Sequence, residues 1–233
     1  MSTNLTDWYP VFNEAKGLPP LMPETIILPA DSTEEEINRT ILYLCKKPEY
    51  FGAGNMPIIG PQPGVFFRVN EVSPKVFTPC KSADDVFDAL LVPRAAKYPD
   101  SHLCFRKYVP NIATDYVELR CFISAGRCTA ITQNDAQVDS EPLDEPEKIK
   151  CIALEFAGVC RKRLAHLQNY TIDIAIHKQT YWRFVVEINS SHREDACTGL
   201  FDENSPSDMA QLDRGIIPKF RYFTSIFLEY EEI

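Results

Sequence analysis

The sequence predicts an α+β protein with mainly antiparallel sheets. Two amphipathic helical patterns lie in the first hundred residues, and the β-rich runs that follow come in hairpin order, without regular β-α-β alternation. Apolar residues make up 45% of the 233 residues and charged residues 24%, as is typical of a folded globular protein. The pattern changes near residue 100, so we expect a smaller N-terminal lobe, 1–100, and a larger C-terminal lobe, 101–233.

Two helices and a strand are predicted in the N-terminal lobe. Residues 32–35 (STEE) have the form of a capping box ahead of an apolar stripe that Pro48 ends. A second helix is expected from Ser82, its N-cap, to Leu91. Between the two helices, 52–64 is rich in proline and glycine and indicates a loop, and 65–70 indicates a strand.

The C-terminal lobe is predicted to be richer in strands. We expect strands at 102–109, 117–124, 127–133, 170–176 and 181–189, with a tight hairpin connection at 124–126. The other expected features are an amphipathic helix over 149–164, polar loops at 134–148 and 202–208, and an aromatic segment, 220–230, that packs back on the body.

Charge and composition exclude several kinds of function. Acidic residues outnumber basic ones 33 to 24, so we expect no binding of nucleic acid. Glycine is scarce, there is no phosphate-loop motif, and the nearest approach to a dinucleotide fingerprint, 52–54 (GAG), lacks the third glycine. No stretch approaches the about 18 apolar residues of a membrane span, and the N-terminus lacks the features of a signal peptide, so a cytoplasmic protein is expected.

The cysteine pattern favours free thiols. None of the eight cysteines forms a C-x-x-C pair, and several lie in apolar periodic segments, where thiols behave as small hydrophobic side chains. Reduced thiols fit an intracellular protein, with disulfides or zinc ligands as the alternatives.

Polar side chains recur at the two-residue period of strands, where alternate residues share a face. These positions are Arg68 with Asn70, Glu118 with Arg120, Gln133 with Asp135, and Glu187 with Asn189, together with Asp173 inside an apolar run. Carboxylate and amide oxygens from adjacent strands suit Mg²⁺, which takes its remaining ligands from water and phosphates. The basic residues that could attract phosphates are Arg68, Arg106, Lys107 and Arg120.

Spacing alone favours a sheet face that is simply solvated, with the metal site as the alternative. One geometric requirement separates the two interpretations. In an antiparallel hairpin, Asp173 and Glu187 share a face only if the numbers of paired residues sum to an even number. A two-residue turn at 178–179 gives an odd sum, so the metal site requires an odd-length loop or a bulge.

Several motifs resemble the cell division cycle protein 123 family, and they occur in that family's order. In the N-terminal half they are 8–12 (WYPVF), 67–70 (FRVN), the proline-basic pair 74–75 and 80–87 (CKSADDVF). Further along they are 105–108 (FRKY), 118–123 (ELRCFI), 132–135 (TQND), and the set Asp173, Glu187 and Asn189, which is also similar to the metal-binding signature of ATP-grasp proteins.

The resemblance implies an ATP-grasp-like fold of two lobes that hold ATP and Mg²⁺ between them. It implies that Asp173, Glu187 and Asn189 ligate Mg²⁺. The residues implied to bind the nucleotide are Arg68, Asn70, Arg106, Lys107, Tyr108, Arg120, Gln133 and Asp135. The positions that depart from the family pattern include Arg68, where the family has lysine, and Glu187, where it has aspartate; the others are Val76, Asn134 and Ser190.

Members of the family are assembly chaperones that bind the gamma subunit of eukaryotic translation initiation factor 2. The resemblance therefore implies this partner and an ATP-binding chaperone, which we expect to be a monomer. The alternative is an ATP-grasp enzyme, a ligase or a phosphoryl or nucleotidyl transferase, acting on an unidentified acceptor. A degenerate protein that binds nothing is a third interpretation, against which the three retained metal-ligand positions argue.

Overall fold

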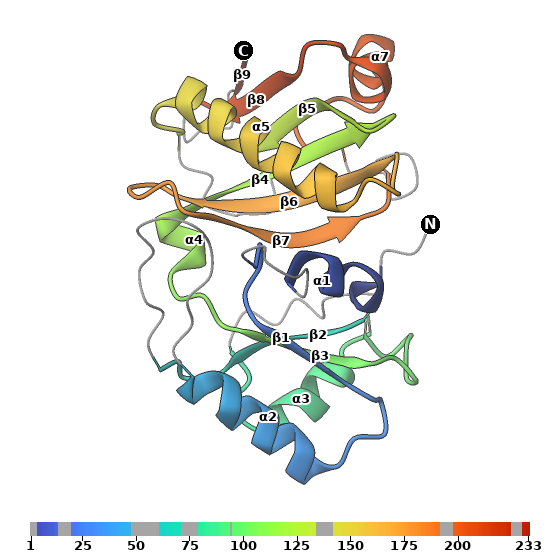
Figure 1. The fold of residues 1–233 in the computed structure, drawn as a ribbon, viewed down its shortest axis with the longest axis vertical. Coiled ribbons are helices and arrows are strands. Elements are labelled where there is room, and N and C mark those ends of the chain that lie inside the picture. The colour runs from blue at the N-terminus through green and yellow to red at the C-terminus, as the bar shows by residue number, and fades with distance from the viewer. Residues whose placement is uncertain are drawn as a thin grey trace. The chain divides into compact units, whose positions relative to one another are not determined.

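The computed structural model describes residues 4–13, 20–47, 61–70, 79–93, 95–133, 142–191, 198–224 and 230–233. The chain divides into two compact units, one that ends at Pro110 and one that runs from Asn111 to Ile233. Each unit combines helices with its own sheet, which confirms the predicted α+β class (Figure 1). The division falls after Pro110, and not near residue 100, because the strand at 103–107 pairs within the N-terminal sheet.

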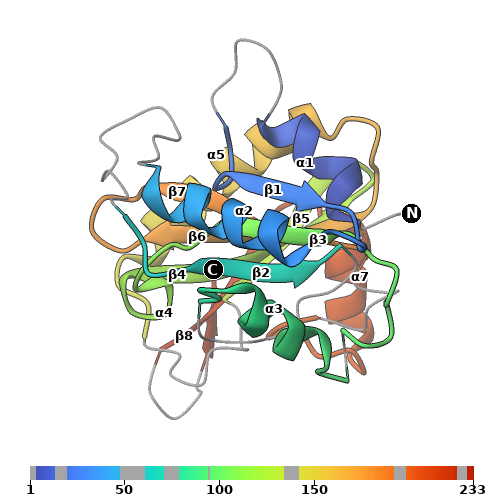
Figure 2. The ribbon, with the colours of Figure 1, turned by 90° about the horizontal axis from the view of Figure 1, so that it is seen from below.

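The N-terminal unit contains α1 (Leu5–Asn13), β1 (Thr25–Leu28), α2 (Glu34–Lys46), β2 (Val65–Val69), α3 (Ala83–Leu90) and β3 (Leu103–Lys107). Its strands form an antiparallel sheet in the order β1-β3-β2. Helices α2 and α3 lie on the same side of this sheet (Figure 2). The core between them includes Ile37, Leu44, Phe67, Val86 and Phe105, all almost fully buried.

Capping boxes define where α2 and α3 begin. At α3 the box is formed by Ser82 and Asp85, as the sequence predicts. At α2 the N-cap is Thr33 with Glu36 at the third helical position, one residue later than predicted. The reason is that the hydroxyl of Ser32 donates a hydrogen bond within the preceding turn.

The C-terminal unit contains α4 (Ile112–Asp115), β4 (Tyr116–Ser124), β5 (Arg127–Gln133), α5 (Pro146–Arg163), β6 (Tyr170–His177), β7 (Arg183–Asn189), α7 (Pro206–Arg214), β8 (Lys219–Phe223) and β9 (Tyr230–Glu232). Its strands form one sheet in the order β7-β6-β4-β5-β8-β9, antiparallel except for the parallel pair β5–β8. The predicted hairpin connection is present, with Ala125 and Gly126 both at positive φ, as a tight two-residue turn requires. None of the helices in the described ranges is long and apolar enough to span a membrane.

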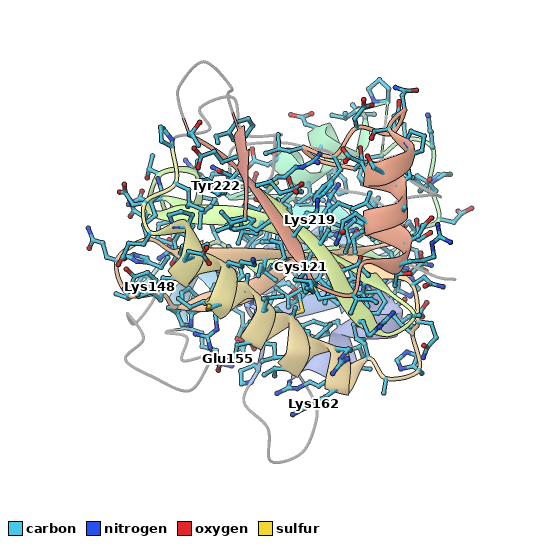
Figure 3. All side chains as sticks on the ribbon, turned by 90° about the horizontal axis from the view of Figure 1, so that it is seen from above. Cys121, Lys148, Glu155, Lys162, Lys219 and Tyr222 are labelled. Carbon is cyan, nitrogen blue, oxygen red and sulfur yellow. The ribbon has the colours of Figure 1, made fainter. Side chains whose placement is uncertain are left out.

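Helix α5 covers one face of the six-stranded sheet, which we call the helix face. Figure 3 shows α5 lying across the strands above Cys121, with Lys148, Glu155 and Lys162 spaced along it. Burial raises the pKa of the Cys160 thiol on α5 to about 12, so this group stays protonated. All the cysteines in the described part of the chain are free, as the sequence predicts, and the eighth lies outside it.

The opposite face of this sheet, which we call the site face, is covered at one end by α7. There Phe122 and Ala130 of the sheet pack against Phe201 and Leu212. The sequence predicted a polar loop over 202–208, and this is wrong from Pro206 onward, where α7 begins. Serine followed by proline places a capping hydroxyl beside a residue suited to the first helical position, so the polar run starts a helix.

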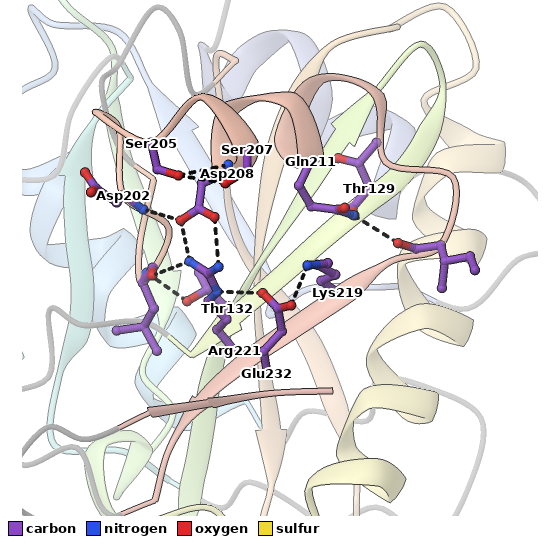
Figure 4. A network of polar contacts seen from close by, with 12 residues as sticks. Thr129, Thr132, Asp202, Ser205, Ser207, Asp208, Gln211, Lys219, Arg221 and Glu232 are labelled. Atoms are coloured by element: carbon purple, nitrogen blue, oxygen red, sulfur yellow. Dashed lines mark hydrogen bonds and ion pairs between the residues drawn. The ribbon is translucent and has the colours of Figure 1, made fainter.

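A network of ion pairs ties α7 to β8 and β9 (Figure 4). The guanidinium of Arg221 makes a bidentate pair with Asp208, with Nη2–Oδ1 at 2.8 Å, and its Nε donates to Glu232 Oε2 at 2.9 Å. It also lies 4.3 Å from the centre of the Phe201 ring, and Lys219 donates to the other oxygen of Glu232. Three elements are therefore joined through one side chain.

This network predicts a pH-dependent contribution to stability. Hydrogen bonds from Arg221 lower the pKa of the Asp208 carboxyl. Asp208 therefore stabilises the fold above its unfolded pKa of about 4 and loses that contribution as the pH falls through the lower, folded value. We expect Asp208→Asn to reduce the free energy of unfolding by about 2 kcal/mol at pH 7. Denaturant titrations of both proteins should show this difference shrinking toward pH 3, and a difference that stays constant would contradict the assignment.

Candidate functional site

Asp173, Glu187 and Asn189 lie on the site face because a bulge shifts the register between β6 and β7. Toward the turn, the numbers of paired residues sum to an odd number, as an even-length loop dictates. Beyond the bulge, Asp173 pairs directly with Glu187, and Thr171 pairs with Asn189. Val186 is the extra residue on β7. The bulge that Asp173 and Glu187 need in order to share a face of the sheet is therefore present.

Arg120 reaches the same site from β4. It pairs with Asp173 in the sheet register, so both side chains project from the site face. Its Nε donates to Asp173 Oδ1 and its Nη2 to Oδ2, both at 2.7 Å. The two side chains are only 9% and 1% exposed. A bidentate pair that is this well buried depends on both partners, because neither charge can be satisfied by water.

The amide of Asn189 lies between the two carboxylates. Its Nδ2 is 3.3 Å from Asp173 Oδ2 and 3.2 Å from Glu187 Oε1. An amide carries donors on one side and an acceptor on the other, so a half turn of this group would present Oδ1 to the same place. The Asn189 NH2 group, which is partly positive, thus lies between the two carboxylates. After a half turn of the amide, Asn189 Oδ1 would be a third oxygen ligand at the same place.

The charge balance of the site favours a cation. Burial raises the pKa of Asp173 to about 6, Arg120 opposes this rise, and the Glu187 carboxylate adds to it. The raised pKa means that the hydrogen bonds and the charge of Arg120 do not fully offset the cost of burying the Asp173 carboxylate. Two carboxylates and one amide oxygen are hard ligands of the kind that Mg²⁺ prefers, so the residues present fit this ion. In the described ranges, no group of three or more His, Cys, Asp or Glu side chains is placed to hold a metal ion, and this site combines two carboxylates with an amide.

Two residues beside this set were not predicted from the sequence. Thr132 pairs with Arg120 across β4 and β5 and therefore also lies on the site face. Its hydroxyl accepts the Leu200 N–H at 3.0 Å. Gly199, at φ 58°, packs so closely that an added Cβ would lie 2.2 Å from Thr132 Cγ2. The sequence gives one indication of this close packing, which is that position 199 is one of only nine glycines among the 233 residues.

Gln133 lies on the helix face and not with Arg120. It pairs with Leu119, the residue before Arg120, and neighbouring residues on a strand point to opposite faces. Its Oε1 accepts the Phe223 N–H at 3.1 Å and so joins β5 to the region of β8. Asp135, predicted as its companion, lies outside the described residues.

Arg68 and Arg106 lie together in the N-terminal unit, on the sheet face opposite α2 and α3. Arg106 pairs with Phe66, and its guanidinium lies 5.9 Å from the centre of that ring. The Nε of Arg68 donates to the carbonyl of Val69 at 3.2 Å. Both arginines are buried, and the predicted residue Tyr108 follows directly after β3. This face therefore carries two adjacent positive charges.

Lys107 and Asn70 each contact the end of a helix. Lys107 points to the α2 side of the sheet, is 1% exposed, and its Nζ donates to the carbonyl of Leu44 at 2.8 Å and to that of Lys47. A cation is favourable there because the last carbonyls of a helix lack partners. Asn70 accepts the Thr6 N–H at 2.9 Å and so caps the start of α1. The geometry gives both residues a structural role.

Comparisons with known proteins identify the family and the fold. The family model D123 matches residues 80–225, more than half of the chain, whereas none of the curated proteins matches it. Among solved structures, the chain is similar to C-terminally truncated Cdc123 from Schizosaccharomyces pombe, with 18% identity over 94% of each chain and a TM-score of 0.60.

Similarity also extends to ATP-grasp enzymes. The D-alanine-D-alanine ligase from Coxiella burnetii matches at 15% identity over 81% of this chain and 47% of that chain, with a TM-score of 0.51. A biotin carboxylase–beta-gamma-ATP complex from Campylobacter jejuni matches at 10% identity over 90% of this chain and 45% of that chain, with a TM-score of 0.55. At such low identities the likeness establishes an ATP-grasp-like fold, as the resemblance implies. With that fold and the match of the family model, the chain belongs to the D123 family, the family of cell division cycle protein 123.

Proposed function

We propose that the chain binds ATP together with Mg²⁺ on the site face of its C-terminal unit. The observation that carries this proposal is the convergence of Arg120, Asp173, Glu187 and Asn189 on one face of an ATP-grasp-like sheet. In this function Asp173, Glu187 and Asn189 hold the cation, and Arg120 is the member of the set that can bind phosphate. Bound Mg²⁺ neutralises and orients phosphate oxygens. The likeness in fold to a protein solved with beta-gamma-ATP supports the proposal.

In the N-terminal unit, Arg68 and Arg106 are the proposed nucleotide-binding residues. They share one face of the sheet and bring two positive charges close together, as a polyphosphate requires. Lys107 and Asn70 are less suited, because their polar groups already contact the ends of α2 and α1. The proposal thus selects two of the five residues that the sequence indicated in this unit.

The proposed partner is the gamma subunit of eukaryotic translation initiation factor 2, which the chain would bind as an assembly chaperone in the cytoplasm. Membership of the D123 family supports this role. The likeness to Cdc123 from S. pombe supports it further, because it covers 94% of both chains.

A second candidate is an ATP-grasp enzyme that transfers a phosphoryl or nucleotidyl group to an acceptor. This candidate is favoured by the identity of residue 187. The family pattern has aspartate at this metal-ligand position, whereas this chain has Glu187, the residue type that is similar to the ATP-grasp ligases. Such an enzyme would use the metal and Arg120 to stabilise the transferred group.

The chaperone and the enzyme differ in how they use ATP: the chaperone needs it to bind its partner, and the enzyme consumes it. A pull-down with the gamma subunit, with and without Mg-ATP, should show retention that depends on the nucleotide if the chain is a chaperone. Retention that is absent or independent of Mg-ATP would contradict this role. Release of ADP or AMP over a panel of acceptors, measured by mass spectrometry, would favour the enzyme.

Nucleotide binding is tested on its own by one matched pair of variants. We expect Glu187→Gln to weaken Mg-ATP binding at least about tenfold, because a metal ligand loses its charge. Glu155→Gln removes the same charge from α5, where the side chain is 69% exposed on the helix face, and should bind like wild type. Titration calorimetry measures both affinities, and equal affinities would contradict the proposed site.

A further inference from the structure

We propose that Arg120 is a built-in counter-cation for Asp173, so that the site binds a divalent metal weakly until an anionic ligand takes over the guanidinium. The residues that would hold the metal all lie on the site face. The identity of the anion as the phosphates of a nucleotide rests on the proposed function.

Arg120 already contacts both oxygens that a metal would use on Asp173. The contacts at 2.7 Å engage Oδ1 and Oδ2 through separate nitrogens of the guanidinium. Oδ1 keeps a further lone pair, and Oδ2, which also accepts from Asn189 Nδ2, regains one when that amide makes its half turn, so the carboxylate can still coordinate a metal. A metal bound there, however, would lie within a few ångströms of a full positive charge.

Arg120 reduces the negative charge that an approaching cation meets. Asp173 and Glu187 contribute two negative charges, and Arg120 contributes one positive charge, so these three side chains together carry one net negative charge. The Arg120 and Asp173 side chains are 9% and 1% exposed, and water therefore screens this repulsion poorly. An anion that draws Arg120 away would expose the full charge of both carboxylates to the metal.

Binding of the metal and binding of the anion are coupled thermodynamically. If the anion tightens metal binding, the metal must tighten anion binding by the same factor. Arg120 would be the side chain that couples the two, because it contacts the metal-binding carboxylate and is suited to phosphate. The opposing interpretation is that Arg120 only stabilises the sheet. In that case its removal would reduce stability without improving metal binding.

The experiment measures binding of Mn²⁺ alone, without nucleotide, from the electron paramagnetic resonance signal of the free ion. Wild type should bind Mn²⁺ weakly, and Arg120→Met should bind it at least about tenfold more tightly, because a neighbouring positive charge is gone. Arg120→Lys should lie between them, since lysine keeps the charge but not the planar fork. The matched control is Arg183→Met, which removes a positive charge from the helix face of β7, where Arg183 pairs with Glu155, and should match wild type.

Arg120→Met leaves Asp173 without its buried partner, so circular dichroism must first establish that the variant is folded. Should it fail to fold, Arg120→Lys decides the test. A second measurement uses inorganic phosphate, which should tighten Mn²⁺ binding to wild type and leave Arg120→Met unaffected. Mn²⁺ affinities of the folded Arg120 variants that equal or fall below that of wild type would overturn the inference.

The outcomes separate this inference from the proposed function. Tight Mn²⁺ binding by Arg120→Met, combined with no binding of Mg-ATP by wild type, would support the counter-cation and overturn the nucleotide function. Binding of Mg-ATP by wild type, with unchanged Mn²⁺ affinity in the Arg120 variants, would support the nucleotide function and overturn the counter-cation.

Discussion

Replacing Asp173 with alanine is expected to lower the free energy of unfolding by about 3–5 kcal/mol. The substitution leaves Arg120, whose side chain is 9% exposed, without the carboxylate that accepts two of its hydrogen bonds. A buried charge that loses its partner keeps the cost of leaving water and loses the compensating attraction. Denaturant titration measures the change, and the same variant should lose Mg-dependent binding of ATP.

The double variant Arg120→Met/Asp173→Leu is the control for this prediction. Replacing both partners of a buried pair by apolar groups of similar size removes the unpaired charge, so most of the lost stability should return. Binding of Mg-ATP should not return, because the metal ligand is still missing. A double variant as unstable as Asp173→Ala would mean that the pair is not the cause of the loss.

The second large effect is expected at Gly199, where alanine should lower the free energy of unfolding by about 3 kcal/mol through backbone strain and a steric clash. The residue has φ 58°, a conformation that disfavours a side chain. An added Cβ would lie 2.2 Å from Thr132 Cγ2, so β5 or the segment around Gly199 would have to shift. Because Thr132 pairs with Arg120, the shift should also weaken binding at the site.

Gly158 provides the matched control. It lies inside α5, and an added Cβ there would meet nothing within 4 Å. The same substitution should therefore raise the free energy of unfolding by about 0.5–1 kcal/mol, because alanine favours the helix. Thermal unfolding of the two variants should show shifts of opposite sign, and a neutral Gly199→Ala would contradict the close packing against Thr132.

The strands of the site could be predicted because their polar residues recur with period two. Glu187 and Asn189 follow this period, and the parity of the hairpin showed that a shared face with Asp173 needs an irregularity. The position of that irregularity could not be predicted. Val186 is β-branched and suits a regular strand as well as a bulge, so its local preference carries no signal.

Other assignments depended on contacts that are distant in the sequence. The motif around Gln133 was found, but the face on which its side chain lies follows from the pairing of β5 with β4. The role of Lys107 depends on where α2 ends, because its ammonium group contacts the last carbonyls of that helix. A basic residue on a strand looks the same in the sequence whether it binds a phosphate or a helix end.

The parallel pairing of β5 with β8 has a consequence for how the C-terminal unit folds. Hairpins such as β4–β5 join neighbouring segments and lose little chain entropy when they close, whereas Ile131 and Phe220, partners in the parallel pair, are far apart in the sequence. We therefore expect the β4–β5 and β6–β7 hairpins to form early and β8 to dock late. The proposed metal ligands Asp173 and Glu187, which lie on the β6–β7 hairpin, would then come together on the nascent protein before its last strands leave the ribosome.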